Sequence, residues 1–405
     1  MKYTKTLWIA ALACSLACSP SAPLEQQQES STLNFRAQEI GADLGVVYAV
    51  LTADVNDDGN TDVVAINETQ AIWFENPSWQ KHVILDGKTE KDNVSIAAQD
   101  IDGDGALDFA LGAAWRPRDT EGGGTLQWIQ REGEAAEPWT MHAIGFEPTL
   151  HRMRWADVDA DGKKDLIVAP LHGRGTAPPN WWQGNGARLL VLRPPADPAN
   201  GPWSEEVADD SLHIVHNVWA TNFDSDPADE ILTASYEGIH MLDRGSDGKW
   251  SKRKLGEGFQ GEEIKGAGEI KLGRLENGQR YLSTVEPWHA NHIVIYEEPS
   301  DPSASWNRRV LTDQLNGGHA LWTADLDGDG DEELAVGWRE AGQGDFAQPG
   351  VAVFDPGDWS YKVLDSGGMA TEDLTITDLN QDGRPDIIAG GRATHNIKIY
   401  WNERQ

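Results

Sequence analysis

The chain has 405 residues and a formal net charge of −33, with 66 acidic side chains against 33 lysines and arginines. Such a chain repels the phosphates of nucleic acids and the headgroups of anionic lipids, which excludes both as partners held by charge. Its two cysteines stand within the first 18 residues, so the rest of the sequence has no disulfide and no thiol chemistry.

The N-terminal segment has the pattern of a secretion signal. Two early lysines precede a short apolar run, too short to span a membrane, and a small residue followed by Cys18. This resembles bacterial lipoprotein signals, which predicts a signal peptide over residues 1–17 and a lipid anchor on Cys18, with Cys14 as a competing site. Serine after Cys18 favours the outer membrane of the cell envelope in such proteins. Residues 18–33, rich in Ser, Pro and Gln, are expected to form a flexible tether.

An acidic turn of the form D-x-[DN]-x-D-G-x-x-[DE] recurs six times from residue 34 onwards. The copies begin at Asp54, Asp100, Asp157, Asn222, Asp325 and Asp378. The spacings are 46, 57, 65, 103 and 53 residues, and the widest gap contains a worn copy at residues 270–278. A repeat of about 50 residues is typical of a circular or stacked architecture.

Each repeat reads as four short strands. An alternating strand leads into the acidic turn, an apolar strand such as 62–66 leaves it, and a third strand such as 71–75 follows. A fourth strand is opened by tryptophan, as at Trp79. The last repeat stops after its third strand, whereas an unpaired strand at 35–40 begins the series. We therefore expect an all-β, seven-bladed β-propeller over residues 34–405, its ring closed by the N-terminal strand, rather than an open solenoid.

The acidic turns are candidate calcium sites, because oxygen ligands at alternate positions of a tight loop suit this hard cation. The expected ligands are Asp54, Asn56, Asp58, Asp62, Asp100, Asp102, Asp104, Asp108, Asp157, Asp159, Asp161, Asp165, Asp325, Asp327, Asp329, Glu333, Asp378, Asn380, Asp382 and Asp386. The fourth turn has Asn222 for aspartate and Pro227 for glycine, which makes its site doubtful. We expect several structural Ca²⁺ ions that hold each hairpin together; a calcium-dependent recognition role is the alternative.

By these turns the chain resembles the FG-GAP/VCBS repeat family of seven-bladed propellers. The resemblance implies the fold. It does not select a function, because members of that family serve in adhesion, structure and catalysis.

Three of the 11 histidines stand six residues ahead of an acidic turn, namely His151, His216 and His319. Glu372 occupies this position in the last copy and Tyr48 in the first. Six residues span about 20 Å of strand, so these side chains are expected at the opposite mouth of the channel. Imidazoles with a carboxylate predict a site for a divalent transition metal such as Zn²⁺ or Mn²⁺. The alternative is a water-filled polar channel that binds nothing.

The loops that follow each second strand should rise at the same mouth. They carry aromatic, basic and imidazole side chains, namely Trp115, His172, Arg174, Trp288, His289, Trp338, Arg339, Arg392 and His395. Tryptophan faces beside hydrogen-bonding groups suit a sugar ring. We expect Tyr48, Trp115, Trp288, Trp338 and Arg339 to bind a small sugar or oligosaccharide.

Short motifs around His151, His172, His289, His319 and His395 resemble the propeller of the fungal aldos-2-ulose dehydratases. The resemblance implies a carbon–oxygen lyase that eliminates water next to a sugar ketone. The open mouth of the expected channel leaves room for a glycosyl leaving group as well.

In that hypothesis the ring histidines hold the metal, with Glu372 of the last repeat as the further candidate ligand. His289 or His395 takes the proton, Arg174 or Arg392 steadies the anion, and His172 completes the candidate catalytic group. Two other classes remain open: a surface sugar-binding protein without turnover, and an adhesion or scaffold propeller in which only calcium matters.

Overall fold

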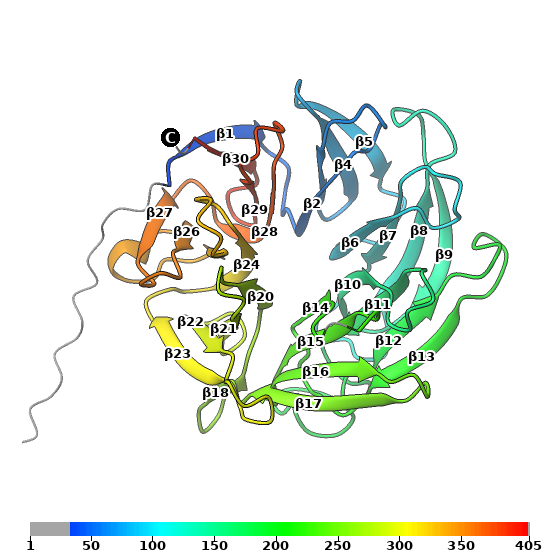
Figure 1. The fold of residues 1–405 in the computed structure, drawn as a ribbon. Helices are drawn as coiled ribbons and strands as arrows, with labels where there is room; N and C mark the ends of the chain where they lie inside the picture. Colours follow the sequence, from blue (N-terminus) through cyan, green and yellow to red (C-terminus); the bar gives the residue numbers. More distant parts are fainter. Residues whose placement is uncertain (1–32, 225, 404–405) are drawn as a thin grey trace, which may run out of the picture.

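The structure, a computed structural model, describes residues 33–224 and 226–403. Its described strands form seven four-stranded antiparallel sheets set like blades around a central channel (Figure 1). The expected all-β, seven-bladed propeller is therefore confirmed. The expected signal peptide, with Cys14 and Cys18, and nearly all of the expected tether lie outside the described residues.

The first four blades follow the order of the chain. Blade 1 consists of β2 (Ala49–Ala53), β3 (Asp62–Ile66), β4 (Gln70–Glu75) and β5 (Gln80–Asp86). Blade 2 consists of β6 (Ser95–Gln99), β7 (Asp108–Ala113), β8 (Thr125–Gln130) and β9 (Thr140–Phe146). Blade 3 consists of β10 (Leu150–Ala156), β11 (Asp165–Pro170), β12 (Leu189–Arg193) and β13 (Ser204–Asp209). Blade 4 consists of β14 (Asn217–Thr221), β15 (Glu230–Ser235), β16 (Gly238–Arg244) and β17 (Trp250–Gly256).

Blades 5 and 6 follow the order of the chain in the same way, and blade 7 brings the two ends of the described chain together. Blade 5 consists of β20 (Ile270–Arg274), β21 (Arg280–Glu286), β22 (His292–Glu297) and β23 (Asn307–Thr312). Blade 6 consists of β24 (Gly318–Ala324), β25 (Glu333–Trp338), β26 (Gly350–Phe354) and β27 (Tyr361–Ser366). Blade 7 consists of β28 (Thr371–Thr377), β29 (Asp386–Gly391), β30 (Ile397–Asn402) and β1 (Phe35–Gly41). A short hairpin, β18 (Phe259–Gln260) with β19 (Lys265–Gly266), and a 3-10 helix, η1 (Gly344–Phe346), lie between blades.

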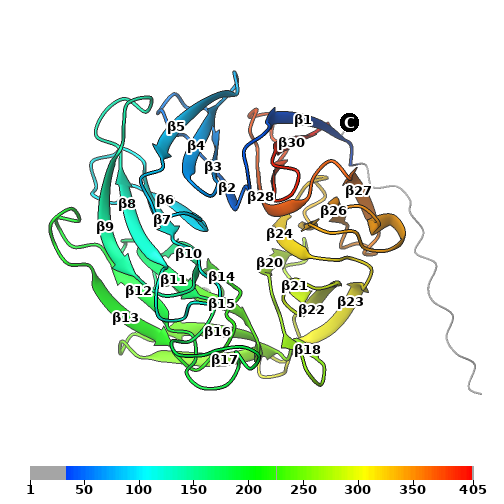
Figure 2. The same cartoon turned by 180° about the vertical axis from the view of Figure 1, so that it is seen from behind.

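The order of strands within a blade explains their composition. The first strand of each blade lies nearest the channel and the fourth lies on the outside (Figures 1 and 2). The second strand has a sheet neighbour on each side and another blade on each face. For this reason β3, β7, β11, β15, β25 and β29 are buried along their whole length and read as apolar runs.

The hydrophobic core lies between the blades. Among the described residues it divides into seven clusters, and each joins two neighbouring blades. One of them packs Val63 and Phe74 of blade 1 against Ile388 and Trp401 of blade 7. The outer edge of blade 7 is β1, which pairs antiparallel with β30 from Phe35 opposite Asn402 onwards. Within the described part of the chain, no helix is both apolar and long enough to cross a membrane.

Candidate functional site

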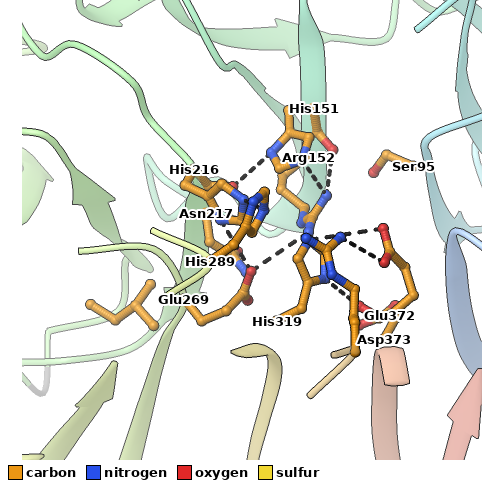
Figure 3. A network of polar contacts seen from close by, with 12 residues as sticks. Ser95, His151, Arg152, His216, Asn217, Glu269, His289, His319, Glu372 and Asp373 are labelled. Atoms are coloured by element: carbon orange, nitrogen blue, oxygen red, sulfur yellow. Dashed lines mark hydrogen bonds and ion pairs between the residues drawn. The ribbon is translucent and has the colours of Figure 1, made fainter. Parts of the chain in front are cut away.

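The histidines that stand six residues ahead of an acidic turn converge at one end of the channel. We call this position in each blade the register position. His151, His216 and His319 are buried, and each offers a ring nitrogen that lies within 4.8 Å of the other two (Figure 3). The sheet register slips by one residue at His151, at His319 and at Glu372, so each of these occupies a β-bulge. A bulge re-aims its side chain, which lets the bulged residue and its successor both face the channel.

Each of these imidazoles has its Nδ1 directed at an oxygen acceptor. His151 Nδ1 donates to the carbonyl of His216 at 2.8 Å, and His319 Nδ1 donates to the carbonyl of Glu372. His216 Nδ1 lies 3.2 Å from Glu269 Oε1. Such partners place the lone pair on Nε2, the arrangement that metal-ligating histidines adopt.

A fourth imidazole joins the cluster from the loop after β21. His289 Nε2 contacts His216 Nε2, and its ring centroid lies 4.7 Å from that of His319. Two imidazole nitrogens that face one another either share a proton or bind one cation together. The sequence predicted His289 as a base and did not predict its contact with His216. It lies in a loop, where the spacing of the acidic turns does not predict which residues meet.

The imidazoles of the cluster are held in the neutral form. Burial, reinforced by neighbouring histidines and arginines, lowers the pKa of His151, His289 and His319 well below the ordinary value. Burial also lowers the pKa of His216. His289 is exposed to the pocket, yet the surrounding protein desolvates its ring. Neutral imidazoles are the form that binds metals and accepts protons.

Glu372 anchors the basic side of the site. Its carboxylate accepts hydrogen bonds from Arg339 Nη1 and Arg392 Nη1, both at 2.8 Å, and lies 3.9 Å from His319 Nε2. The Arg392 guanidinium also lies over the ring of Tyr48, 5.5 Å from its centroid. The two arginines thus bind the carboxylate in place of a metal, and they remain fixed at the pocket wall.

Two residues of the cluster were missed by the sequence analysis. Glu269 is the register residue of blade 5, immediately before β20, and it is 3 % exposed. The worn turn of this blade has Leu275 in place of the first aspartate from which the position is counted, which hid Glu269. Arg152 follows the bulge at His151; its Nη1 lies 3.0 Å from His151 Nε2 and its Nη2 lies 3.6 Å from Glu269 Oε1. A cation bound by His151 would have to displace this guanidinium toward Glu269.

Three imidazoles of the cluster, those of His151, His289 and His319, line a pocket of about 550 Å³. Its lining includes Tyr48, Trp115, His151, Arg152, His289, His319, Arg339, Glu372 and Arg392. The indole of Trp115 stacks on the imidazole of His151, with centroids 4.9 Å apart. The structure therefore brings most of the expected site residues into one cavity.

Two of the expected sugar-binding tryptophans are not in the pocket. Trp338 is fully buried against Phe346 in the core between blades, and its Nε1 donates to the carbonyl of Gln348. Trp288 does not line the pocket either; its Nε1 is buried without a hydrogen-bond partner among the described residues. The assignment of Trp338 is corrected because this indole is a core residue, and half-buried Trp288 lies outside the pocket lining.

Three of the expected catalytic side chains are also elsewhere. His172 is buried and stacks on Trp181 with centroids 4.1 Å apart, which lowers its pKa by burial to about 4. The guanidinium of Arg174 donates twice to Glu147, at 3.1 and 2.6 Å. His395 is an exposed loop residue that does not line the pocket. A loop at the correct end of a blade therefore does not by itself place a side chain in the site.

The acidic turns lie at the other end of the strands. In the first copy the amides of Asp58 and Gly59 donate to Asp54, at 3.1 and 2.9 Å. The amide of Val55 donates to Asp62, whose burial raises its pKa to about 6. The same burial raises the pKa of the last carboxylate in the other turns, to about 6 for Asp108, Asp165 and Asp386, about 7 for Glu230 and about 8 for Glu333.

Carboxylates gather in these turns at the spacing of a cation site. Among the described residues, four groups have oxygens within 4.8 Å of one another: Asp100, Asp102 and Asp108; Asp157, Asp159 and Asp161; Asp224, Asp226 and Glu230; Asp325, Asp327 and Glu333. Glu230 Oε1 and Glu333 Oε1 are buried without a hydrogen-bond partner in the described structure. The donor set fits Ca²⁺. The fourth turn, doubtful from its sequence, gathers its carboxylates as three of the other turns do.

Comparisons with known proteins agree with both resemblances. The model of the FG-GAP-like repeat matches residues 32–111, and that of the aldos-2-ulose dehydratase β-propeller domain matches residues 123–299. Both expected resemblances are confirmed. The aldos-2-ulose dehydratase of Phanerodontia chrysosporium is 29 % identical over 306 residues, which cover 69 % of this chain and 31 % of that protein. The propeller is thus a distant relative of a carbohydrate dehydratase, and it spans about a third of that relative's length.

Solved structures support the architecture. Two crystal structures of BBS1N in complex with ARL6DN, soaked with lead or with mercury, align over 93 % of this chain and 98 % of theirs, at 13 % identity. Their TM-scores are 0.55 and 0.56. At this identity the likeness shows the fold alone.

Proposed function

We propose that the propeller is a metal-dependent carbohydrate lyase that performs β-elimination next to the keto group of a sugar or an oxidised glycoside. One observation carries the proposal: imidazoles from different blades meet at a sugar-sized pocket, each of the three buried ones with its Nδ1 against an oxygen. The distant relationship to a carbohydrate dehydratase supports the same chemistry.

The donor set fits a divalent transition metal such as Zn²⁺ or Mn²⁺. His151, His216 and His319 would hold the ion, and Glu269 orients His216. Three neutral nitrogen ligands with an open fourth position are typical of catalytic rather than structural zinc. When bound, the metal supplies a Lewis acid for the ketone oxygen.

The remaining pocket residues take the other roles. Trp115 offers an indole surface on which the sugar ring stacks. Neutral His289, open to the pocket, accepts at Nδ1, the ring nitrogen that does not contact His216, the proton that leaves the carbon next to the ketone. Arg339 and Arg392 stabilise the negative charge that then develops on the sugar. The carbon–oxygen bond at the β position breaks as the double bond forms, and the hydroxyl leaves as water with the proton that His289 has accepted.

The first test is metal content. Protein purified without a histidine tag should contain about one zinc, manganese or iron ion per chain in addition to calcium. This ion should be lost in His151→Ala and His319→Ala and kept in His395→Ala, a matched histidine outside the pocket. Retention of the metal by both ring variants would refute the site.

The second test is turnover. Keto-sugars such as aldos-2-uloses and oxidised glycosides should yield an unsaturated ketone, seen by its ultraviolet absorbance, at a rate that depends on the ring histidines. Binding of the sugars without product would identify a sugar-binding module instead. Absence of both binding and product would favour an adhesion or scaffold propeller.

We also propose that Ca²⁺ occupies the acidic turns, and that the chain is exported and lipid-anchored through Cys18, or Cys14, in a bacterial envelope. Calcium titration followed by calorimetry tests the first proposal. Labelling with a fatty-acid analogue in cells tests the second: loss of label in Cys18→Ala but not Cys14→Ala would assign the anchor, and no label in the natural chain would refute it.

A further inference from the structure

A second cavity of about 300 Å³ lies along the channel, beyond the histidine cluster in the direction of the acidic turns. Its lining includes Trp155, Trp219, Trp322, Arg154 and Asp373. Arg154 lies three residues beyond His151 on β10, which corresponds to about 10 Å of strand. Tyr48, Val94 and Arg152 line both cavities, so the two spaces adjoin. We call this cavity the channel chamber.

Two cations, Arg154 in the lining of the channel chamber and Lys271 beside it over two of the lining indoles, form no direct ion pair with a carboxylate among the described residues. Arg154 Nη1 donates to the carbonyl of Met153 at 2.7 Å, and Lys271 Nζ to that of Ile270 at 3.4 Å. Lys271 is 3 % exposed. Its ammonium lies 4.4 Å from the ring centroid of Trp219 and 5.2 Å from that of Trp322, and the guanidinium of Arg154 lies 5.8 Å from that of Trp219.

Burying these two cations has a cost in desolvation free energy. Buried charges in proteins are normally paired, because desolvation is not repaid by backbone carbonyls and indole faces alone. Two buried carboxylates, Asp373 and Glu269, attract both cations but form no direct ion pair with them among the described residues. Asp373 accepts from the amide of Val50 at 3.1 Å, and Glu269 contacts His216 and Arg152. Burial lowers the pKa of Lys271 to about 7. A chain with a net charge of −33 has thus placed two cations without a direct carboxylate partner inside its channel.

We propose that the channel chamber is a second binding site, which takes a carboxylate-bearing sugar with its anionic group between Arg154 and Lys271 and its ring against Trp219 and Trp322. The cations supply charge-assisted hydrogen bonds, and the indoles supply the apolar surface on which sugar rings stack. A volume near 300 Å³ is at the small end of ligand sites, which fits a single sugar unit. The site does not require turnover at the histidine cluster.

The test is calorimetric binding of glucuronate, glucose and acetate to the metal-loaded protein. Glucuronate should bind with a Kd at least tenfold below those of glucose and acetate. Arg154→Met and Lys271→Met remove the charge but keep the aliphatic stem, and each should weaken glucuronate binding about tenfold, equivalent to about 1.4 kcal/mol. Arg309→Met, at an exposed arginine of the outer strand β23, is the matched control and should bind as the natural chain does.

Equal binding of glucose and glucuronate would overturn the proposal, as would full glucuronate binding in both methionine variants. Acetate binding as tight as glucuronate binding would show a simple anion site and would overturn the assignment to a sugar. If the charge variants fail to fold, Trp219→Phe together with the salt dependence of glucuronate binding decides the same question. His319→Ala should lose the transition metal and keep glucuronate binding. The metal site and the channel chamber can therefore be refuted independently.

Discussion

The two ends of the channel are built from the same strands, yet they differ in how strictly the blades repeat. At the acidic end six of the seven blades carry an acidic turn, and among the described residues the carboxylates gather in four of them, including Asp224, Asp226 and Glu230 of the altered fourth turn. At the histidine end the register positions hold different residues in different blades. Repetition serves stability, because every blade needs the same hairpin. Chemistry needs several different groups around one point, and only divergence among the blades supplies them.

The largest expected effect separates the two ends directly. His319→Ala should reduce transition-metal affinity and lyase activity by more than about 100-fold, because removing a ligand costs more than removing a supporting residue. Calcium content and thermal stability should stay near those of the natural chain, since the turns lie at the other end of the strands. Metal analysis, turnover and calorimetry report these three quantities. A parallel loss of calcium would contradict the separation.

Calcium removal should act in the opposite way. A chelator selective for calcium should lower the melting temperature by about 5–10 °C, since a cation at 100 times its Kd stabilises the folded state by about 2.7 kcal/mol. The transition metal should remain bound. Asp325→Ala should reproduce part of the loss, whereas Glu276→Ala in the worn turn of blade 5 should not. An unchanged melting temperature in the chelator would show that the turns fold without cations.

Glu269 tests the comparison of the two ends within a single blade. Blade 5 has lost its acidic turn at one end, but it supplies Glu269 to the histidine cluster at the other. Glu269→Gln should weaken transition-metal binding by about 10–100-fold, since it removes the carboxylate that orients His216. Competition with a metal indicator gives the affinity. Glu262→Gln, at an exposed position of the β18–β19 hairpin, is the control. Unaltered metal affinity in Glu269→Gln would leave Glu269 as a packing residue only.

The smallest expected effect is on the pH dependence of folding stability, which sets the pH range in which the two ends can be compared in a folded protein. His240 on β16 belongs to neither end, and burial lowers its pKa from 6.5 to about 4. Between these values the unfolded chain binds more protons than the folded one, so this contribution to stability is present above pH 6.5 and declines as the pH falls toward 4. His240→Phe should flatten the pH dependence of urea unfolding over this range. His395→Gln, at an exposed histidine, should leave it unchanged.

Some residues of the site could be predicted from the sequence and others could not. His151, His216 and His319 were found because a repeat fixes which residues share a level of the channel. The loops gave no such rule, so Trp115 and His289 reached the pocket while Trp338 became core and His395 stayed at the surface. Glu269 was hidden because its turn had lost the first aspartate, from which the register position is counted.

By itself, the sequence determined the propeller, the number of blades, the acidic turns and the level of the histidine ring, since all four follow from periodicity along the chain. Only the tertiary structure decided which side chains meet. The β-bulges at His151, His319 and Glu372 turn successive residues toward the channel, and the packing between blades selects which loop residues are buried. Both depend on contacts between segments far apart in sequence, which local patterns do not encode.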